Sequence, residues 1–125
     1  MSEKMTIVKA LMRATSEKDY ETFLSYLSDD IEYHYHVGSR PLLGKEWVSK
    51  FLDKYETICG DSEWRIDRHA ETDDYIMVEG YEEYTDLRTG DRVAHPYMGI
   101  IEFEDGKVKK WRDYFEMDNK KSEAA

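Results

Sequence analysis

Three ionisable residues, Asp113, Glu82 and His95, occupy positions where the alternation of three expected strands puts them among apolar neighbours. A carboxylate in such surroundings must be hydrogen-bonded, paired, or raised in pKa, so that it can hold or release a proton near neutrality. An imidazole beside it can act as a general acid whose pKa the negative charge raises. If the three side chains converge, they provide an acid and a base for proton transfer to a small molecule.

The strand that carries Asp113 follows an Asp-Gly pair at residues 105–106. Asp-Gly is a strong signal of a two-residue hairpin, because both central residues of the favoured turn need a positive φ. The strand is expected to run to about residue 117, with Trp111, Asp113 and Phe115 on one face. Asp113 is the polar exception on that face.

Two longer strands, predicted from Tyr75 to Asp86 and from Arg92 to Glu104, carry Glu82 and His95 on mostly apolar faces. A further strand, residues 31–37, directs two tyrosines inward. The predicted catalytic residues are Asp113, Glu82, His95 and Tyr33. The predicted substrate-binding residues are Tyr35, Tyr84, Tyr97, Trp111 and Phe115.

Three N-terminal helices are expected to pack on the sheet that these strands form. Periodicity predicts a helix over residues 6–14, a second one capped by Ser16 and carrying Phe23, Leu24 and Leu27, and a third after Gly44. The third has a broad apolar stripe, typical of a helix packed across a sheet: Trp47, Val48, Phe51, Leu52, Tyr55 and Ile58. With a strand over residues 63–70, this order indicates an α+β domain whose curved, mostly antiparallel sheet encloses a pocket.

Length and composition limit the possible functions. The chain has 125 residues, which fits one domain over residues 1–118 with a polar tail over residues 119–125. Its net charge of -10 opposes binding to nucleic acid or to anionic membranes, and no apolar run is long enough to span a bilayer. The single Cys59 allows no internal disulfide. We therefore expect a cytoplasmic protein that acts on a small molecule.

The closing segment Trp-Arg-Asp-Tyr-Phe at residues 111–115 resembles the limonene-1,2-epoxide hydrolase family, within the NTF2-like (SnoaL-like) cone fold. The resemblance implies a pocket in which two carboxylates, a bridging arginine, a tyrosine and an asparagine handle a water molecule without a cofactor. One carboxylate takes a proton from the water, and the other protonates the epoxide oxygen. By this resemblance the carboxylates fall on Asp113 and Glu82, and the tyrosine falls on Tyr33. The arginine and the asparagine are replaced by Gly80 and Tyr35.

Simpler interpretations of the site residues remain open. Asp113 could form a structural ion pair with Arg65 or Arg68 of a neighbouring strand. A one-residue bulge in the Glu82-Glu83 pair would change which of the two points inward. His95 precedes a proline and could lie at a strand irregularity or a dimer surface. His34 and His36 have the spacing of a metal pair, but exposed histidines and no metal are expected.

Three functions fit these observations. The first is addition of water to a small apolar epoxide. The second is isomerisation, dehydration or cyclisation of the ketosteroid-isomerase or SnoaL type, which needs the arginine less. The third is a non-catalytic ligand-binding or dimerisation module. A homodimer is expected in every case, because an apolar outer surface is formed by Tyr75, Met77, Tyr81, Met98 and Ile100.

Overall fold

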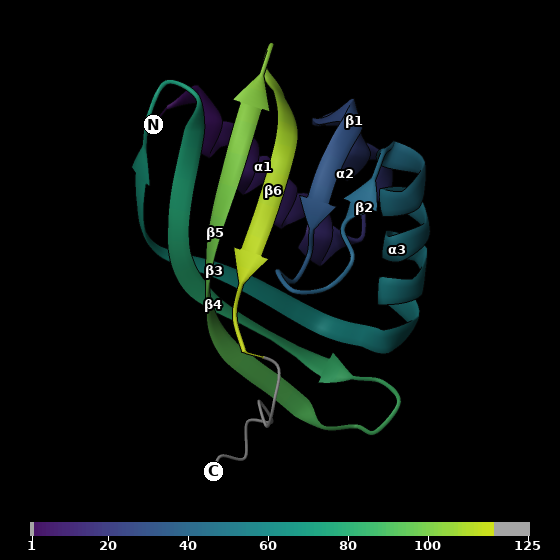
Figure 1. The fold of residues 1–125 in the computed structure, drawn as a ribbon. Coiled ribbons are helices and arrows are strands. Elements are labelled where there is room, and N and C mark those ends of the chain that lie inside the picture. Colours follow the sequence, from purple (N-terminus) through teal and green to yellow (C-terminus); the bar gives the residue numbers. More distant parts are fainter. Residues whose placement is uncertain (1, 117–125) are drawn as a thin grey trace.

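The computed structural model describes residues 2–116, so the predicted tail over residues 119–125 and the predicted strand end at residue 117 lie outside it. Its elements are α1 (Glu3–Glu17), α2 (Tyr20–Ser25), β1 (Leu27–His34), β2 (Leu42–Leu43), α3 (Lys45–Ile58), β3 (Cys59–Glu71), β4 (Tyr75–Asp86), β5 (Arg92–Glu104) and β6 (Lys107–Tyr114), as Figure 1 shows.

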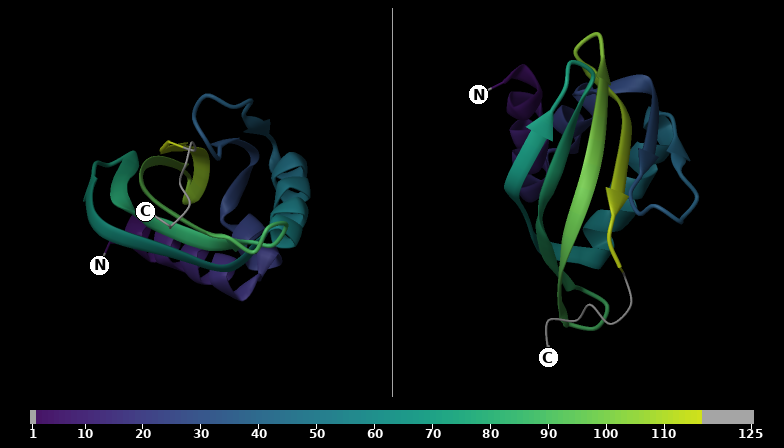
Figure 2. Two further views of the ribbon diagram at one scale, coloured as in Figure 1. Left: turned by 90° about the horizontal axis from the view of Figure 1, so that it is seen from below. Right: turned by 60° about the vertical axis from the view of Figure 1, so that its left-hand side comes forward.

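The six strands form one sheet in the order β2-β1-β6-β5-β4-β3. All neighbouring strands are antiparallel except β1 and β6, which are parallel. The strands are strongly curved, with α1 against β3 and β4, and α3 against β1, β2 and β3 (Figure 2). The sheet is therefore mostly antiparallel, and its concave side faces the helices.

Helix α1 is longer than the sequence predicts. The hydroxyl of Ser2 caps it by accepting a hydrogen bond from the Met5 N–H, and Lys18 ends it in the left-handed conformation with a φ of 59°. Ser16 lies inside α1, so the prediction that it caps α2 is wrong. The cap is Asp19, whose carboxylate accepts from the Thr22 N–H. A carboxylate is as good a cap as a hydroxyl, and sequence alone does not choose between them.

The ends of several elements also differ from prediction. β4 and β5 have the predicted bounds, but Leu27 belongs to β1 and not to α2, and β1 ends at His34. The chain leaves the sheet there: the Val37 N–H bonds to the carbonyl of Asp113, and Gly38 has a φ of 109°. β1 and β2 also separate α2 from α3, so the three helices are not one N-terminal block.

The core lies between α1, α3 and the concave face. Val8 and Leu11 of α1 are fully buried, as are Val48 of α3 and Ile101 of β5. Trp47, which we expected in the buried stripe of α3, is 56% exposed and has the Lys50 ammonium over its ring. Trp47 therefore lies on the outer side of α3, whereas its neighbour Val48 points into the core.

The convex face is partly exposed. Met98 is 46% exposed, and Ile100 and Met77 on the same face are half-buried. The homodimer predicted from this surface stays a prediction. Within residues 2–116, no helix has both the length and the apolar character that crossing a membrane requires.

Candidate active site

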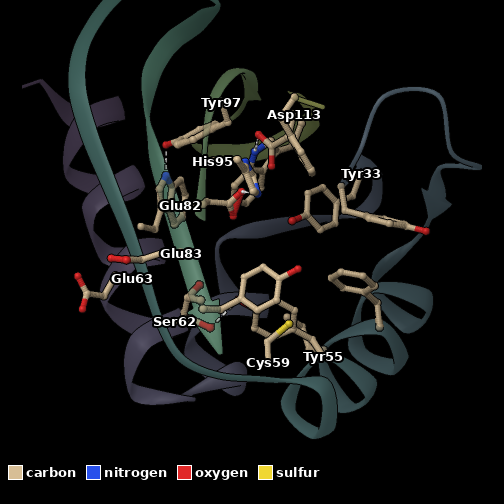
Figure 3. A pocket seen from close by; sticks show the side chains of 18 of the residues that line it. Tyr33, Tyr55, Cys59, Ser62, Glu63, Glu82, Glu83, His95, Tyr97 and Asp113 are labelled. Carbon is tan, nitrogen blue, oxygen red and sulfur yellow. Dashed lines mark hydrogen bonds and ion pairs between the residues drawn. The ribbon is translucent and has the colours of Figure 1, made fainter. Parts of the chain in front are cut away.

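A cavity of about 190 Å³ lies between the concave face of the sheet and α3 (Figure 3). All nine predicted site residues line it. They come from four strands and the segment after β6: Tyr33 and Tyr35 in or after β1, Glu82 and Tyr84 in β4, His95 and Tyr97 in β5, Trp111 and Asp113 in β6, and Phe115. Period-2 alternation therefore places the side chains as expected.

Asp113 is held on β6 opposite Gly99 of β5, with 8% of its surface exposed. The Trp111 indole Nε1 donates a hydrogen bond of 3.0 Å to its Oδ1. A Cβ at residue 99 would lie 2.7 Å from the same oxygen, so only glycine leaves room for the carboxyl group. Burial and then the negative charge of Glu82 raise the pKa of Asp113 well above its usual range, against the opposing effect of the Trp111 bond.

The structural ion pair that we considered for Asp113 does not form. Arg65 pairs with Asp67 at 2.7 Å, and Arg68 pairs with Glu79 at 3.0 Å. All four of these side chains are substantially exposed. Asp113 is thus left with an indole N–H as its partner, which does not neutralise a charge.

Glu82 of β4 lies opposite His95 of β5 and Trp64 of β3. The β4–β5 ladder is continuous through Glu82 and Glu83, so the bulge that would have exchanged them is absent from it. About 32% of the Glu82 side chain is accessible, and it lines the cavity. Burial raises the pKa of Glu82 to about 7. Near neutral pH, Glu82 can therefore both accept and release a proton.

His95 is 3% exposed and lies beside Glu82, with its Nε2 3.9 Å from the Glu82 Oε1. Its Nδ1 is 3.1 Å from the carbonyl oxygen of Pro96. Because a carbonyl only accepts, Nδ1 carries the proton in that hydrogen bond. The ring stacks on Phe115 at 4.4 Å. The imidazole is therefore fixed with Nε2 toward the carboxyl group.

Tyr33 faces the two carboxyl groups from β1 (Figure 3). It is 9% exposed, and its ring centroid lies 4.9 Å from that of Trp111. Its hydroxyl makes no hydrogen bond to any other residue in the described part of the chain. Burial, followed by the charges of Asp113 and Glu82, raises the pKa of Tyr33. The phenol therefore stays neutral and can donate its proton in a hydrogen bond to a ligand.

Gly80, which stands where the resembling family has its arginine, has no space for a side chain. A Cβ there would overlap the carbonyl oxygen of Arg65 on β3, where a register shift between Ile66 and Arg68 brings the two strands close together. On the other side, Gly80 is paired with Tyr97, whose hydroxyl accepts a hydrogen bond from the Trp64 indole. An arginine at this position is therefore excluded by the backbone as well as by the sequence.

A model of the SnoaL-like domain matches residues 8–111. The chain belongs to the SnoaL-like domain family. It is 28% identical over 111 residues to the epoxide hydrolase EphG of Mycobacterium tuberculosis, across 88% of this chain and 71% of that protein.

Two solved structures are similar to this SnoaL-like domain. The structure of an M. tuberculosis LEH-like epoxide hydrolase has a TM-score of 0.80 at 26% identity, over 91% of this chain and 83% of that one. An NTF2-like protein of unknown function from Burkholderia pseudomallei has a TM-score of 0.83 at 21% identity, over 93% of this chain and 92% of that one. The fold is thus NTF2-like, and the relatives support a small-molecule acid–base enzyme.

Several residues of the cavity wall were not predicted from the sequence. Tyr55 of α3, which we assigned to packing, lines the cavity and shares a hydrogen bond of 2.8 Å with Ser62 of β3. Cys59 and Thr15 also line it. The position of Tyr55 at the C-terminal end of the apolar stripe was the available signal for this role, whereas nothing local distinguished Ser62.

The histidine pair expected on the surface is half-buried instead. His34 Nε2 lies 2.7 Å from the Glu32 carboxylate, and His36 Nε2 lies 3.0 Å from the carbonyl oxygen of Phe115. Each imidazole is therefore held by a neighbour of its own. Residues 2–116 contain no group of three or more histidine, cysteine, aspartate or glutamate side chains placed to hold a metal ion.

Proposed function

We propose that this SnoaL-like protein adds water to the epoxide ring of a small apolar substrate, without a cofactor. The observation that carries the proposal is the pair of carboxyl groups, Glu82 and Asp113, whose pKa values are both raised and which line one cavity with the free hydroxyl of Tyr33. Two nearby carboxyl groups without a cation share one proton near neutrality. Such a pair holds one acid and one base at the same time.

The proton of the pair belongs on Asp113 and the negative charge on Glu82. Asp113 is the more buried of the two, and the charge of Glu82 raises its pKa further, so Glu82 ionises first. Glu82 is then the general base and Asp113 the general acid. His95, 3.9 Å from Glu82, is suited to relay the proton that returns from Glu82 to Asp113 after each turnover.

The reaction follows from these roles. Tyr33 orients a water molecule by hydrogen bonding. Glu82 takes a proton from this water while the oxygen of the water bonds to an epoxide carbon. The C–O bond of the ring breaks, and the leaving oxygen takes the proton of Asp113. The product is a diol that contains one oxygen from water. Transfer of a proton from Glu82 back to Asp113 restores the starting state.

The aromatic side chains are proposed to hold the apolar body of the substrate. Tyr35, Tyr84, Tyr97, Trp111 and Phe115 line the cavity around the carboxyl groups. A cavity of about 190 Å³ accommodates a small molecule but not a polymer. An anionic substrate would meet four carboxyl groups on the wall: Glu63, Glu82, Glu83 and Asp113. The wall therefore disfavours an anionic substrate.

Incubation with a panel of small epoxides in 18O-labelled water tests the proposal. Wild-type protein is expected to give singly labelled diol, and Asp113→Asn and Glu82→Gln are expected to lower kcat/KM by about 10²–10⁴-fold. Asp67→Asn, which makes the same change in an exposed ion pair, should leave kcat/KM unchanged. Failure of the panel to give labelled diol, or full activity in Asp113→Asn, contradicts hydrolysis.

Isomerisation is the second candidate, because the same groups form an oxyanion site that needs no arginine. A protonated Asp113 and a neutral Tyr33 can both donate hydrogen bonds to a developing enolate oxygen, while Glu82 moves the proton between carbons. A β,γ-unsaturated ketone offered in deuterated water would become conjugated and take up deuterium. Tyr33→Phe should slow this reaction, and an unchanged ketone contradicts it.

A further inference from the structure

The wall of the cavity carries negative groups without a permanent positive charge among them. Within the described part of the chain, none of the residues that line the cavity is a lysine or an arginine. At its rim, the Arg92 guanidinium lies 3.6 Å from Glu83 and 3.9 Å from Glu63, so these two carboxylates have a partner. Glu82 and Asp113, farther in, have only the imidazole of His95 and the indole of Trp111 beside them.

The protein cannot place its own cation beside this carboxyl pair from the neighbouring backbone. Residue 80 has no space for a Cβ because of the Arg65 carbonyl. Residue 99 has none either, because its Cβ would press on the Asp113 carboxyl group. Among the described residues, neither of these two neighbouring positions can therefore carry a permanent positive charge into the space between Glu82 and Asp113.

Next to the carboxyl pair, aromatic rings form a continuous wall. The ring centroid of Tyr33 lies 4.9 Å from that of Trp111 and 6.0 Å from that of Phe51, and Phe51 stacks on Tyr35 at 4.6 Å. In residues 2–116, the cations that lie over rings are at Trp47 and Tyr81, outside this wall. Aromatic faces carry negative potential and attract organic cations within about 6 Å of the ring centroid.

The hydroxyl of Tyr33 points into the same space (Figure 3). Tyr33 is more than nine-tenths buried, and within the described chain its hydroxyl has no hydrogen-bond partner. A hydroxyl that lines a cavity and has no partner among the described residues can bond to a ligand or to water there. Its oxygen can accept a hydrogen bond from an ammonium N–H or from a hydroxyl group of the ligand.

We propose that this cavity binds small organic ammonium ions, with the positive head between Glu82 and Asp113 and its alkyl groups against the aromatic wall. The ligand then supplies the charge that no side chain of the cavity supplies. The binding uses the same cavity as the proposed reaction but does not depend on epoxide hydrolysis. It extends the range of ligands from neutral apolar molecules to protonated or quaternary amines.

The affinity for such an ion should depend on pH. Apart from the other carboxyl group, the titratable groups that face Glu82 are His95, Tyr33, Tyr55, Tyr97, Tyr84 and Cys59. Burial raises the pKa of the Cys59 thiol to about 12 and raises the pKa values of the tyrosines, so these groups stay neutral near pH 8. Glu82 ionises as the pH rises through about 7. Cation affinity therefore rises over that interval.

Choline and its uncharged isostere 3,3-dimethylbutan-1-ol form a matched pair of probes, because they differ in charge and hardly in shape. Dissociation constants are measured through the fluorescence of Trp64 and Trp111, which line the cavity, and through ligand-observed NMR. At pH 8 we expect choline to bind about tenfold more tightly than the alcohol. Below pH 6 the two probes should bind about equally. Calorimetry at pH 6.5 in two buffers should show proton release with choline only.

Two variants locate the effect. Glu82→Gln should remove the preference for choline, whereas Glu21→Gln, the same change at an exposed position of α2, should retain it. The pH dependence of the wild-type protein provides the same information if Glu82→Gln does not fold. Equal affinities at pH 8, or no binding of choline at tens of millimolar, overturn the proposal. A clear preference without any diol formation contradicts only the hydrolase proposal.

Discussion

Carboxyl groups on the two faces of the sheet differ in whether an arginine lies beside them. On the convex face, Glu102 lies 2.8 Å from Arg112, and Glu79 lies 3.0 Å from Arg68. On the concave face, Glu82 and Asp113 have no arginine or lysine partner among the described residues, and their pKa values are raised. Arg112 and Asp113 are neighbours in sequence, yet alternation directs them to opposite faces.

This comparison explains how the sheet can be stable and still hold reactive groups. An arginine beside a carboxylate favours its charged form, so the carboxylate stays ionised and takes little part in proton transfer. A buried carboxyl group without a cation can keep its proton to neutral pH, at a cost in stability when it ionises. Separation of the arginines from the cavity therefore underlies both the proposed chemistry and the proposed cation binding.

The largest expected effect concerns Gly80, the position that keeps an arginine out of the cavity. Gly80→Ala should lower the free energy of unfolding by about 2–3 kcal/mol, because the new Cβ overlaps the Arg65 backbone. Gly60→Ala is the matched control in the same pair of strands: its Cβ would meet the end of the Leu87 side chain at 2.9 Å, and Leu87 is 52% exposed and can move. Urea denaturation of both variants measures the difference. Equal stabilities of the two variants would show that β3 can move away from the new Cβ at residue 80 at little cost.

The next effect is a dependence of stability on pH that originates on the concave face. The pKa of Glu82 is 4.5 when unperturbed and about 7 in the folded protein. Because the folded state retains a proton that the unfolded state has lost, the contribution of Glu82 to stability is fully present below pH 4.5 and is lost as the pH rises to about 7. We expect the free energy of unfolding to decrease by on the order of 2 kcal/mol between pH 5 and pH 8 from this group.

Asp113 acts in the same direction, and carboxylates that are paired with an arginine outside the cavity act in the opposite one. Hydrogen bonds from Arg88 lower the pKa of Asp86, so its contribution to stability is lost as the pH falls below about 4. Denaturant titrations of wild type and Glu82→Gln from pH 5 to pH 8 separate these contributions. The free energy of unfolding of the variant should fall less steeply with pH than that of the wild type. Equal slopes would mean that Glu82 is ionised over the whole interval.

A smaller effect concerns Gly99, which positions Asp113. Gly99→Ala places a Cβ 2.7 Å from Oδ1, so the carboxyl group must move away from its indole partner. We expect kcat/KM of whichever reaction is found to fall by about tenfold, with a changed pH profile. A purely structural role would lower stability without moving the profile. Gly60→Ala again serves as the control, and an unchanged profile in Gly99→Ala contradicts the positioning role.

Much of the site could be predicted because alternation along a strand is a local property. The bounds of β4 and β5 and the inward direction of Glu82, His95 and Asp113 needed only the order of apolar and polar residues. The SnoaL-like family, whose model matches residues 8–111, was likewise recognisable from a resemblance over nearly the whole chain that includes the segment at residues 111–115.

Other features depend on distant contacts and were out of reach. The exclusion of a side chain at Gly80 requires the register shift on β3, and the cavity role of Tyr55 requires Ser62 beside it. Serine and aspartate both cap helices well, so the sequence did not decide whether Ser16 or Asp19 caps α2. Local patterns thus placed side chains on faces, whereas strand contacts decided what each face contains.

The smallest effect is expected on the convex face itself. Glu102→Gln removes the charge that pairs with Arg112 at 2.8 Å, where both side chains keep a quarter to a third of their surface exposed. Solvent screens such a pair, so the free energy of unfolding should fall by about 1 kcal/mol or less. The effect should shrink in 1 M salt, where charges are screened within about 3 Å. A loss as large as that of Gly80→Ala would mean that the convex ion pairs, and not only the packed core, determine the stability of the sheet.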